Sequence, residues 1–163
     1  MTKNTRLALV TGSSRGIGKA IALDFAENGL DILVTGRNST RLQMVKREIE
    51  DTGVKGHVVS ADLGVEDGIQ KIHNYILANG LSVDILVNNA AIIHPRLSLI
   101  DFEMLEWERV IDVNLIAAVK LTKLLLPNMI SQNYGKIINI SSIGGRKGAA
   151  GRSAYRVTKA ALI

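Results

Sequence analysis

The sequence contains no cysteine, and this absence excludes disulfide bonds, thiolate metal sites and thiol nucleophiles together. Such a composition suits a reducing compartment, so we expect a cytoplasmic protein. The histidines, His57, His73 and His94, are isolated and lack the spacing of metal ligands, so we expect no metal site. No apolar stretch approaches the roughly 20 residues that span a bilayer, and residues 1–6 lack the pattern of a signal peptide. The sequence therefore does not predict a membrane partner.

Aromatic side chains are also scarce, at 4% of the residues. The net charge of +5 would favour nucleic-acid binding if the basic residues were clustered. They are instead scattered along the chain and mixed with acids, as in Lys46-Arg47-Glu48, and few aromatic rings are present to stack on bases. We therefore expect a small-molecule substrate rather than a nucleic acid.

Apolar runs of strand length alternate with longer segments of helical periodicity, which is typical of a parallel sheet with crossover helices. The length of 163 residues and the hydrophobic content of 47% suit a single domain, residues 1–163. The expected strands are Leu7–Thr11, Ile32–Thr35, His57–Ser60, Ile85–Asn88 and Ile137–Ser141. Because these runs are continuously apolar, both faces of the sheet should be covered, as in a doubly wound α/β fold.

Helices are expected between these strands, over about residues 16–28, from Ser39 onward, over 65–79 and over 104–132. Gly29 follows the first of them as a C′ residue, and Ser39 is a plausible N-cap of the second. Leu42, Val45 and Ile49 share one face of that second helix. Pro127 lies inside the last and longest segment, where a kink or break is allowed.

A glycine-rich turn follows the first expected strand and opens the first expected helix, reading Thr11-Gly12-Ser13-Ser14-Arg15-Gly16-Ile17-Gly18. Glycines at such a turn let the backbone approach a pyrophosphate closely, and the helix N-terminus supplies amide donors and a favourable dipole. An ordinary strand-to-helix loop is the alternative. The position at the first turn of an α/β unit favours a dinucleotide site.

The residues after the second strand, Gly36-Arg37-Asn38, lack the acid that would bind the ribose 2′-hydroxyl of NAD. Arg37 can pair with a 2′-phosphate instead, and Arg15 is placed to reach the same group. NADP is therefore favoured over NAD, the alternative being that Arg37 is a solvated loop residue.

Tyr155 and Lys159 are four residues apart in Tyr155-Arg156-Val157-Thr158-Lys159. On a helix this offset places the phenol and the ammonium on one face, one turn apart, and a nearby positive charge favours the ionised phenol. An ordinary surface pair has the same spacing, so the rest of the sequence decides between the two interpretations.

The ordered motifs together resemble the short-chain dehydrogenase/reductase family over nearly the whole chain. They are the Thr-Gly-x-x-x-Gly-x-Gly turn, Asn88-Asn89-Ala90-Ala91 after the fourth strand, Asn114 in the long helix, Ser141-Ser142 after the fifth strand, and the Tyr155 and Lys159 pair. The resemblance is nearest to 3-oxoacyl carrier-protein reductases and to polyol or sugar-acid dehydrogenases. Ala91 replaces the family glycine, where its methyl group would either crowd the cofactor or shift the backbone slightly. An asparagine at 88 or 89 is also typical of a residue that stabilises a turn.

The resemblance implies a Rossmann-like fold and hydride transfer between NADP(H) and a carbonyl or secondary alcohol, such as a 3-oxoacyl thioester or a sugar acid. Tyr155 would donate the proton, and Ser142, which is selected by its spacing from Tyr155, would orient the carbonyl oxygen. Lys159 would hold the ribose and stabilise ionised Tyr155. Asn114 would support a water in the proton relay. The implied cofactor-binding residues are Gly12, Ser14, Arg15, Gly16, Ile17, Gly18, Arg37, Asp62, Leu63, Asn89, Ala90, Tyr155 and Lys159. Among them, Asp62 and Leu63 would flank the adenine, with Asp62 accepting a hydrogen bond from its amino group.

Members of the family continue beyond the position of Ile163 into further strands and a substrate loop, and they form dimers or tetramers. The resemblance therefore implies an incomplete C-terminus, with the last strands missing, and a homo-oligomer when intact. A chain of residues 1–163 alone would leave its fifth strand as an apolar edge, so we expect it to be poorly soluble and inactive. The alternative is a natural short form that binds NADP without turnover.

Overall fold

The computed structural model describes residues 5–163 and places their strands in a five-stranded parallel sheet of order β3-β2-β1-β4-β5. This order confirms the predicted Rossmann-like α/β fold. The strands are β1 Leu7–Thr11, β2 Asp31–Gly36, β3 Gly56–Ser60, β4 Ile85–Asn88 and β5 Lys136–Asn139. The prediction that the fifth strand reaches Ser141 is wrong. Ile140 still donates its N–H to Asn88, but the chain then leaves the ladder, so Ser141 and Ser142 lie beyond the strand.

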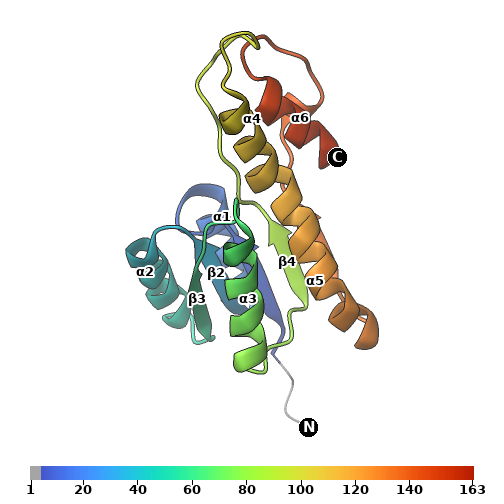
Figure 1. Ribbon diagram of the computed structural model, residues 1–163. Coiled ribbons are helices and arrows are strands. Elements are labelled where there is room, and N and C mark those ends of the chain that lie inside the picture. Colours follow the sequence, from blue (N-terminus) through green and yellow to red (C-terminus); the bar gives the residue numbers. More distant parts are fainter. Residues whose placement is uncertain (1–4) are drawn as a thin grey trace.

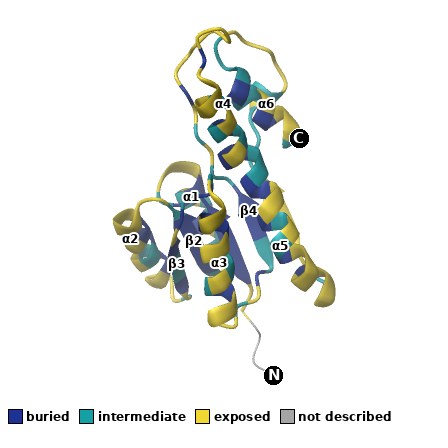
Figure 2. Cartoon of the chain, viewed as in Figure 1, coloured by how far each residue is buried: buried dark blue, intermediate teal, exposed yellow. Residues whose placement is uncertain are grey.

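Helices cover both faces of the sheet, and successive residues of β1 point to opposite faces. Leu7 and Leu9 pack with the helices α3, Glu66–Ala78, and α5, Ala117–Ser131. Ala8 and Val10 pack with α1, Gly16–Glu27, and α2, Ser39–Glu50. Figure 2 shows β2 and β4 mostly buried and the outward faces of α2, α3 and α5 exposed. The strand β5 is exposed along its length. The continuously apolar strands are thus explained by two separate cores.

The capping residues predicted for the first two helices agree only in part with those in the structure. Gly29 follows α1 with a φ of +83°, a conformation that glycine adopts easily, which confirms it as the C′ residue. Ser39 is not the N-cap of α2, because Asn38 holds that position and its Oδ1 accepts a hydrogen bond of 2.9 Å from the N–H of Arg41. Both residue types cap helices well, and the extended backbone at Asn38 decides between them.

The long helix expected over 104–132 is interrupted, but not at its proline. It consists of α4, Met104–Ile111, a π-helical turn η1, Asp112–Ile116, and α5. Pro127 stays inside α5 on its exposed side, where water can bind the carbonyl group that loses its helical donor. The interruption at η1 accompanies two adjacent buried residues, Val113 and Asn114.

The helices α4 and α6, Ser153–Ala161, lie with their connecting loops beyond the carboxyl ends of the strands (Figure 1). A small apolar cluster joins them, built from Phe102, Val110 and Ala154 with Trp107 packed against it. The indole of Trp107 also donates a hydrogen bond of 3.2 Å to Ser153 Oγ. In a doubly wound fold this end of the sheet carries the ligand site. Within residues 5–163, no helix has the length and apolar character to cross a membrane.

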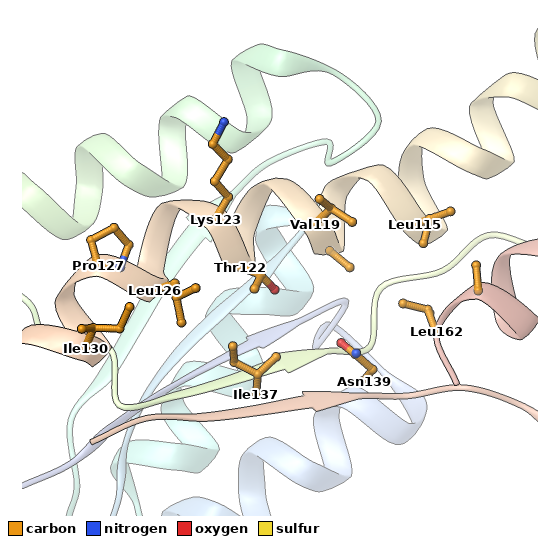
Figure 3. Close-up of a pocket in the computed structure, with 12 residues that line it drawn as sticks. Leu115, Val119, Thr122, Lys123, Leu126, Pro127, Ile130, Ile137, Asn139 and Leu162 are labelled. Atoms are coloured by element: carbon orange, nitrogen blue, oxygen red, sulfur yellow. The ribbon is translucent and has the colours of Figure 1, made fainter. Parts of the chain in front are cut away.

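An apolar groove of about 500 Å³ runs beside β5, the edge strand of the sheet, between α5 and the end of α6 (Figure 3). Ile137 lines it, while Ile138 points to the other face of the sheet beside α1, and each side chain is 39% exposed. Leu162 closes one end of the groove near Asn139. Few polar groups line this groove, so the chemistry must be sought elsewhere.

Candidate functional site

The glycine turn between β1 and α1 is packed so closely that side chains do not fit at two of its positions. Gly12 has a φ of +64°, and a Cβ there would lie 2.8 Å from the Cα of Ala90. A Cβ on Gly18 would collide with Asn89 Nδ2 and lie 2.6 Å from the carbonyl oxygen of Gly12. The turn is therefore pressed against the segment that follows β4.

Two buried hydroxyl groups hold this turn in place, and the sequence had not marked either as functional. Thr11 Oγ1 donates to the carbonyl of Val87 at 3.0 Å and accepts hydrogen bonds from the N–H groups of Asn89 and Ala90. Ser13 Oγ donates to the carbonyl of Val10 and accepts from the N–H of Thr35 at 3.0 Å. The one available signal was the place of Thr11 at the head of the glycine motif.

The two asparagines at the end of β4 have different roles: Asn89 stabilises the glycine turn, whereas Asn88, the last residue of the strand, joins two strands. The amide of Asn89 donates to the carbonyl groups of Thr11 at 2.7 Å and Gly12 at 3.3 Å. The amide of Asn88 donates to Asn139 Oδ1 at 2.9 Å and so joins β4 to β5. Asn89 therefore stabilises the backbone of the glycine turn through these two hydrogen bonds.

One cavity, of about 380 Å³, brings together most of the residues predicted to bind the cofactor. Its lining includes Gly12, Ser14, Arg15, Gly16, Ile17, Gly18, Arg37, Asp62, Leu63, Asn89 and Ala90. Gly36, Ala61, Ala91, Ile92 and Val113 complete it, and the sequence had not singled out Ala61, Ile92 or Val113. No side chain of residues 5–163 caps the N-terminus of α1, which opens at this cavity. The amide donors of that first turn suit a pyrophosphate, and the cavity thus fits a dinucleotide.

Gly18→Ala tests this packing. We expect NADPH affinity to fall at least about tenfold, because the added methyl group must displace Asn89 or the Gly12 carbonyl, and such overpacking costs roughly 1–3 kcal/mol. Gly148→Ala is the matched control, since a Cβ there meets no atom within 4 Å. Fluorescence titration with NADPH measures both variants. Wild-type affinity in the Gly18→Ala protein would contradict the proposed fit.

Charges in the cavity come from two exposed arginines and one carboxylate. Arg15 and Arg37 line it, and neither forms an ion pair with a carboxylate in the part of the chain that the structure describes. Asp62 instead pairs with Arg109 of α4 at 2.7 Å and accepts a 2.9 Å hydrogen bond from the N–H of Gly64. Burial alone would raise the pKa of Asp62, but these hydrogen bonds and the charges of Arg109 and Arg37 lower it below its usual value. Asp62 is therefore ionised at neutral pH.

Lys159 is 3% exposed and its ammonium lies 5.9 Å from the centre of the Tyr155 ring, both on α6. Its Nζ donates a 2.6 Å hydrogen bond to the carbonyl of Ile140, just after β5. Burial lowers the pKa of Lys159 because the charged form loses hydration. The pair is thus a close, partly desolvated arrangement, as the sequence spacing predicts.

The two serines after β5 have different surroundings. Ser141 Oγ donates a 2.6 Å hydrogen bond to the carbonyl of Lys159, so it anchors α6. Ser142 Oγ accepts a 3.0 Å hydrogen bond from the N–H of Gly144. A Cβ on Gly144 would lie 3.3 Å from Ser142 Oγ and 3.8 Å from Tyr155 Cε1. The side chains of Ser142 and Tyr155 therefore lie close together, on either side of Gly144. This arrangement favours Ser142 over Ser141 as the hydroxyl that faces a substrate.

Asn114 is buried in η1, and both its side-chain oxygen and its side-chain nitrogen form hydrogen bonds. Its Oδ1 accepts a 2.8 Å hydrogen bond from the N–H of Ile92, while its Nδ2 donates to the carbonyl of Ile92 and to Thr158 Oγ1. Asn114 thus clamps the segment after β4 to α6 beside Lys159. The support of a relay water by Asn114 stays a prediction. Thr158 is a further supporting residue that the sequence did not indicate.

The predicted site residues therefore form two neighbouring groups. Ser142, Tyr155 and Lys159 lie by α6 and do not line the 380 Å³ cavity. Ile92, which lines the cavity and is held by Asn114, connects the two groups. Residues 5–163 contain no cluster of three His, Cys, Asp or Glu side chains that could hold a metal ion.

Comparison with known proteins finds relatives over nearly the whole chain. A profile of the short chain dehydrogenase family matches residues 6–163. A 3-oxoacyl-(acyl-carrier-protein) reductase, FabG, of Aquifex aeolicus is 43% identical over 161 residues, covering 97% of this chain and 64% of the relative. The corresponding reductase of Staphylococcus aureus is 38% identical, with coverages of 99% and 65%. The chain thus spans slightly less than two thirds of the length of these relatives.

Two solved structures share the fold closely. A metagenomic short-chain oxidoreductase in complex with NADP superposes with a TM-score of 0.91 at 37% identity, covering 96% of this chain and 71% of that one. L-sorbose reductase from Gluconobacter frateurii, complexed with NADPH and L-sorbose, gives a TM-score of 0.92 at 33% identity, with coverages of 97% and 60%. On these grounds the chain belongs to the short-chain dehydrogenase/reductase family.

Proposed function

We propose that this protein is an NADP-dependent oxidoreductase that interconverts a carbonyl compound and a secondary alcohol. The observation that carries the proposal is the cavity in which the uncapped N-terminus of α1 meets Arg15 and Arg37, next to the Tyr155 and Lys159 pair on α6. A 3-oxoacyl thioester is the first candidate substrate, and a sugar acid or polyol the second. The names of the relatives support these classes.

One set of residues would bind the cofactor, and another would transfer the proton. The α1 N-terminus would bind the pyrophosphate, and Arg37 with Arg15 would bind the 2′-phosphate. The bound nicotinamide supplies or accepts the hydride. Tyr155 would donate a proton from its hydroxyl to the carbonyl oxygen while Ser142 hydrogen-bonds the same oxygen. The Lys159 ammonium would stabilise the phenolate that remains and hold the ribose.

A second candidate is an NADP-binding module without turnover. The position of Lys159 favours it, because one of the three ammonium N–H donors is bonded to the Ile140 carbonyl and the side chain does not line the 380 Å³ cavity. The two candidates differ in one measurement. Oxidation of NADPH in the presence of a 3-oxoacyl thioester or a keto sugar supports the enzyme, and binding of NADPH with no turnover across such substrates supports the module.

We further propose that the protein is a cytoplasmic homo-oligomer, a dimer or tetramer. Exposed apolar side chains on α5 support an oligomer, namely Val119, Leu126 and Ile130. Contiguous apolar surface of this kind is typically covered in the working assembly.

The cofactor preference is tested at Arg37. We expect the wild-type protein to bind NADPH at least about tenfold more tightly than NADH, a difference of about 1.4 kcal/mol. Arg37→Asp should erase or reverse this preference, because a carboxylate repels the 2′-phosphate and accepts from a 2′-hydroxyl. Arg41→Asp, with the same charge change on the exposed side of α2, is the control and should leave the ratio unchanged. Titration of each variant with both nucleotides gives the ratio, and equal affinities in the wild type would contradict the proposal.

A further inference from the structure

Asp62 lines the 380 Å³ cavity, called the nucleotide cavity from here on, but its carboxylate is paired with a residue outside that cavity. Arg109 of α4 does not line the cavity, yet its guanidinium contacts Asp62 Oδ2 at 2.7 Å. The two side chains are 34% and 33% exposed, so water screens the pair only in part. The residues are far apart in the sequence, and the contact joins the loop after β3 to the helix that leads to Asn114.

The pairing is fixed by close packing around it. A Cβ on Gly64 would lie 2.8 Å from Val113 Cγ2 and 3.0 Å from a terminal nitrogen of Arg109. The loop after β3 therefore rests directly on α4 and η1, with no space for a side chain between them. Arg109 is held against Asp62 by this contact as well as by charge.

Without Arg109, the charge of Asp62 would oppose a phosphorylated cofactor. Asp62 shares the cavity with Arg37, and the positive charge of Arg37 is close enough to lower the pKa of Asp62. An unpaired carboxylate would attract the Arg37 guanidinium away from a 2′-phosphate and would repel the phosphate itself. A cofactor with a 2′-hydroxyl carries no such charge and would be affected far less.

We propose that Arg109 is a positioning residue that sets the preference for NADPH over NADH by neutralising Asp62. It acts through Asp62 and leaves Arg37 available to the 2′-phosphate. This inference rests on the proposed NADP-dependent function and adds a residue outside the cavity to its specificity.

The test is a mutant cycle read as dissociation constants of NADPH and NADH from fluorescence titration. Arg109→Ala should weaken NADPH binding at least about fivefold and NADH binding less than about twofold. Arg109→Gln keeps an N–H donor and most of the volume but removes the charge, and it should give the same loss. In the Asp62→Asn background, where no carboxylate is left unpaired, Arg109→Ala should change NADPH affinity less than about twofold.

Lys120→Ala is the matched control. It breaks an ion pair of the same length, Lys120 with Glu66 at 2.7 Å, which also links the long helix to the start of α3 but lies outside the cavity. We expect both nucleotide affinities to stay within about twofold of the wild type.

The outcomes separate this inference from the function on which it rests. Equal losses for both nucleotides, with no rescue by Asp62→Asn, would show that Arg109 only supports the fold and would overturn the inference. An unchanged NADPH to NADH ratio in Arg109→Ala and Arg109→Gln, in a wild type that prefers NADPH, would overturn the inference alone. A wild type with no preference for NADPH would overturn both.

Discussion

The Tyr155→Phe protein should reduce a carbonyl substrate roughly a thousandfold more slowly than the wild type, within the range that general acid catalysis contributes. NADPH affinity should stay within about twofold, because this change leaves intact the residues that line the nucleotide cavity and Lys159, which is proposed to hold the ribose. Only the hydroxyl is removed, so the ring keeps its place on α6 beside Lys159. The loss should therefore fall on kcat rather than on binding.

Absorbance at 340 nm with a 3-oxoacyl thioester measures the rate, and fluorescence titration measures the affinity. Tyr134→Phe is the control, because Tyr134 stacks with Arg6 outside the nucleotide cavity and its substitution should leave both values unchanged. Turnover by the Tyr155→Phe protein at more than about a tenth of the wild-type rate would show that another group donates the proton.

Replacement of Lys159 by methionine should lower kcat about a hundredfold and weaken NADPH binding about tenfold, since one ammonium would serve both phenolate and ribose. Stability should respond differently. Burial lowers the pKa of Lys159, so the folded chain binds this proton less tightly than the unfolded chain does. The charged lysine therefore costs stability at neutral pH, and the cost is lost as the pH rises through the folded and then the unfolded pKa.

Methionine removes that cost and the hydrogen bond to the Ile140 carbonyl together. We expect the free energy of unfolding at neutral pH to fall by no more than about 1 kcal/mol. Urea denaturation of both proteins, combined with kinetics, checks this. Activity lost in step with folded protein would instead mean that Lys159 is structural.

The sequence was sufficient where a local pattern determines the structure. The continuously apolar strands predicted a sheet covered on both faces, and Leu7 and Ala8 do point to different cores. The glycine turn and the spacing of Tyr155 and Lys159 likewise depend on residues near each other in the chain. Their positions followed from strand and helix periodicity alone.

Contacts between distant segments could not be predicted in the same way. The ion pair of Asp62 with Arg109 depends on how α4 crosses the loop after β3, and neither residue has a local pattern that identifies the other. The hydrogen bonds of Asn114 with Ile92 and Thr158 also join segments that are distant in the sequence, so they could not be predicted either. At the start of α2, two good capping residues are adjacent, and only the backbone conformation decided for Asn38.

The π-helical turn η1 has a consequence for how the length of related chains should vary. Neighbouring residues of a regular α-helix point about 100° apart, which hinders the burial of two adjacent side chains on one side of the helix. The wider turn lets Val113 pack on the loop after β3 while Asn114 binds Ile92. Such turns arise from one additional residue in a helix, and they are frequent at functional sites. A homologue one residue shorter at Asp112–Ile116 should keep the helices α4 and α5 in place but lose one of these two contacts. A single alignment gap at η1 would therefore indicate an altered site.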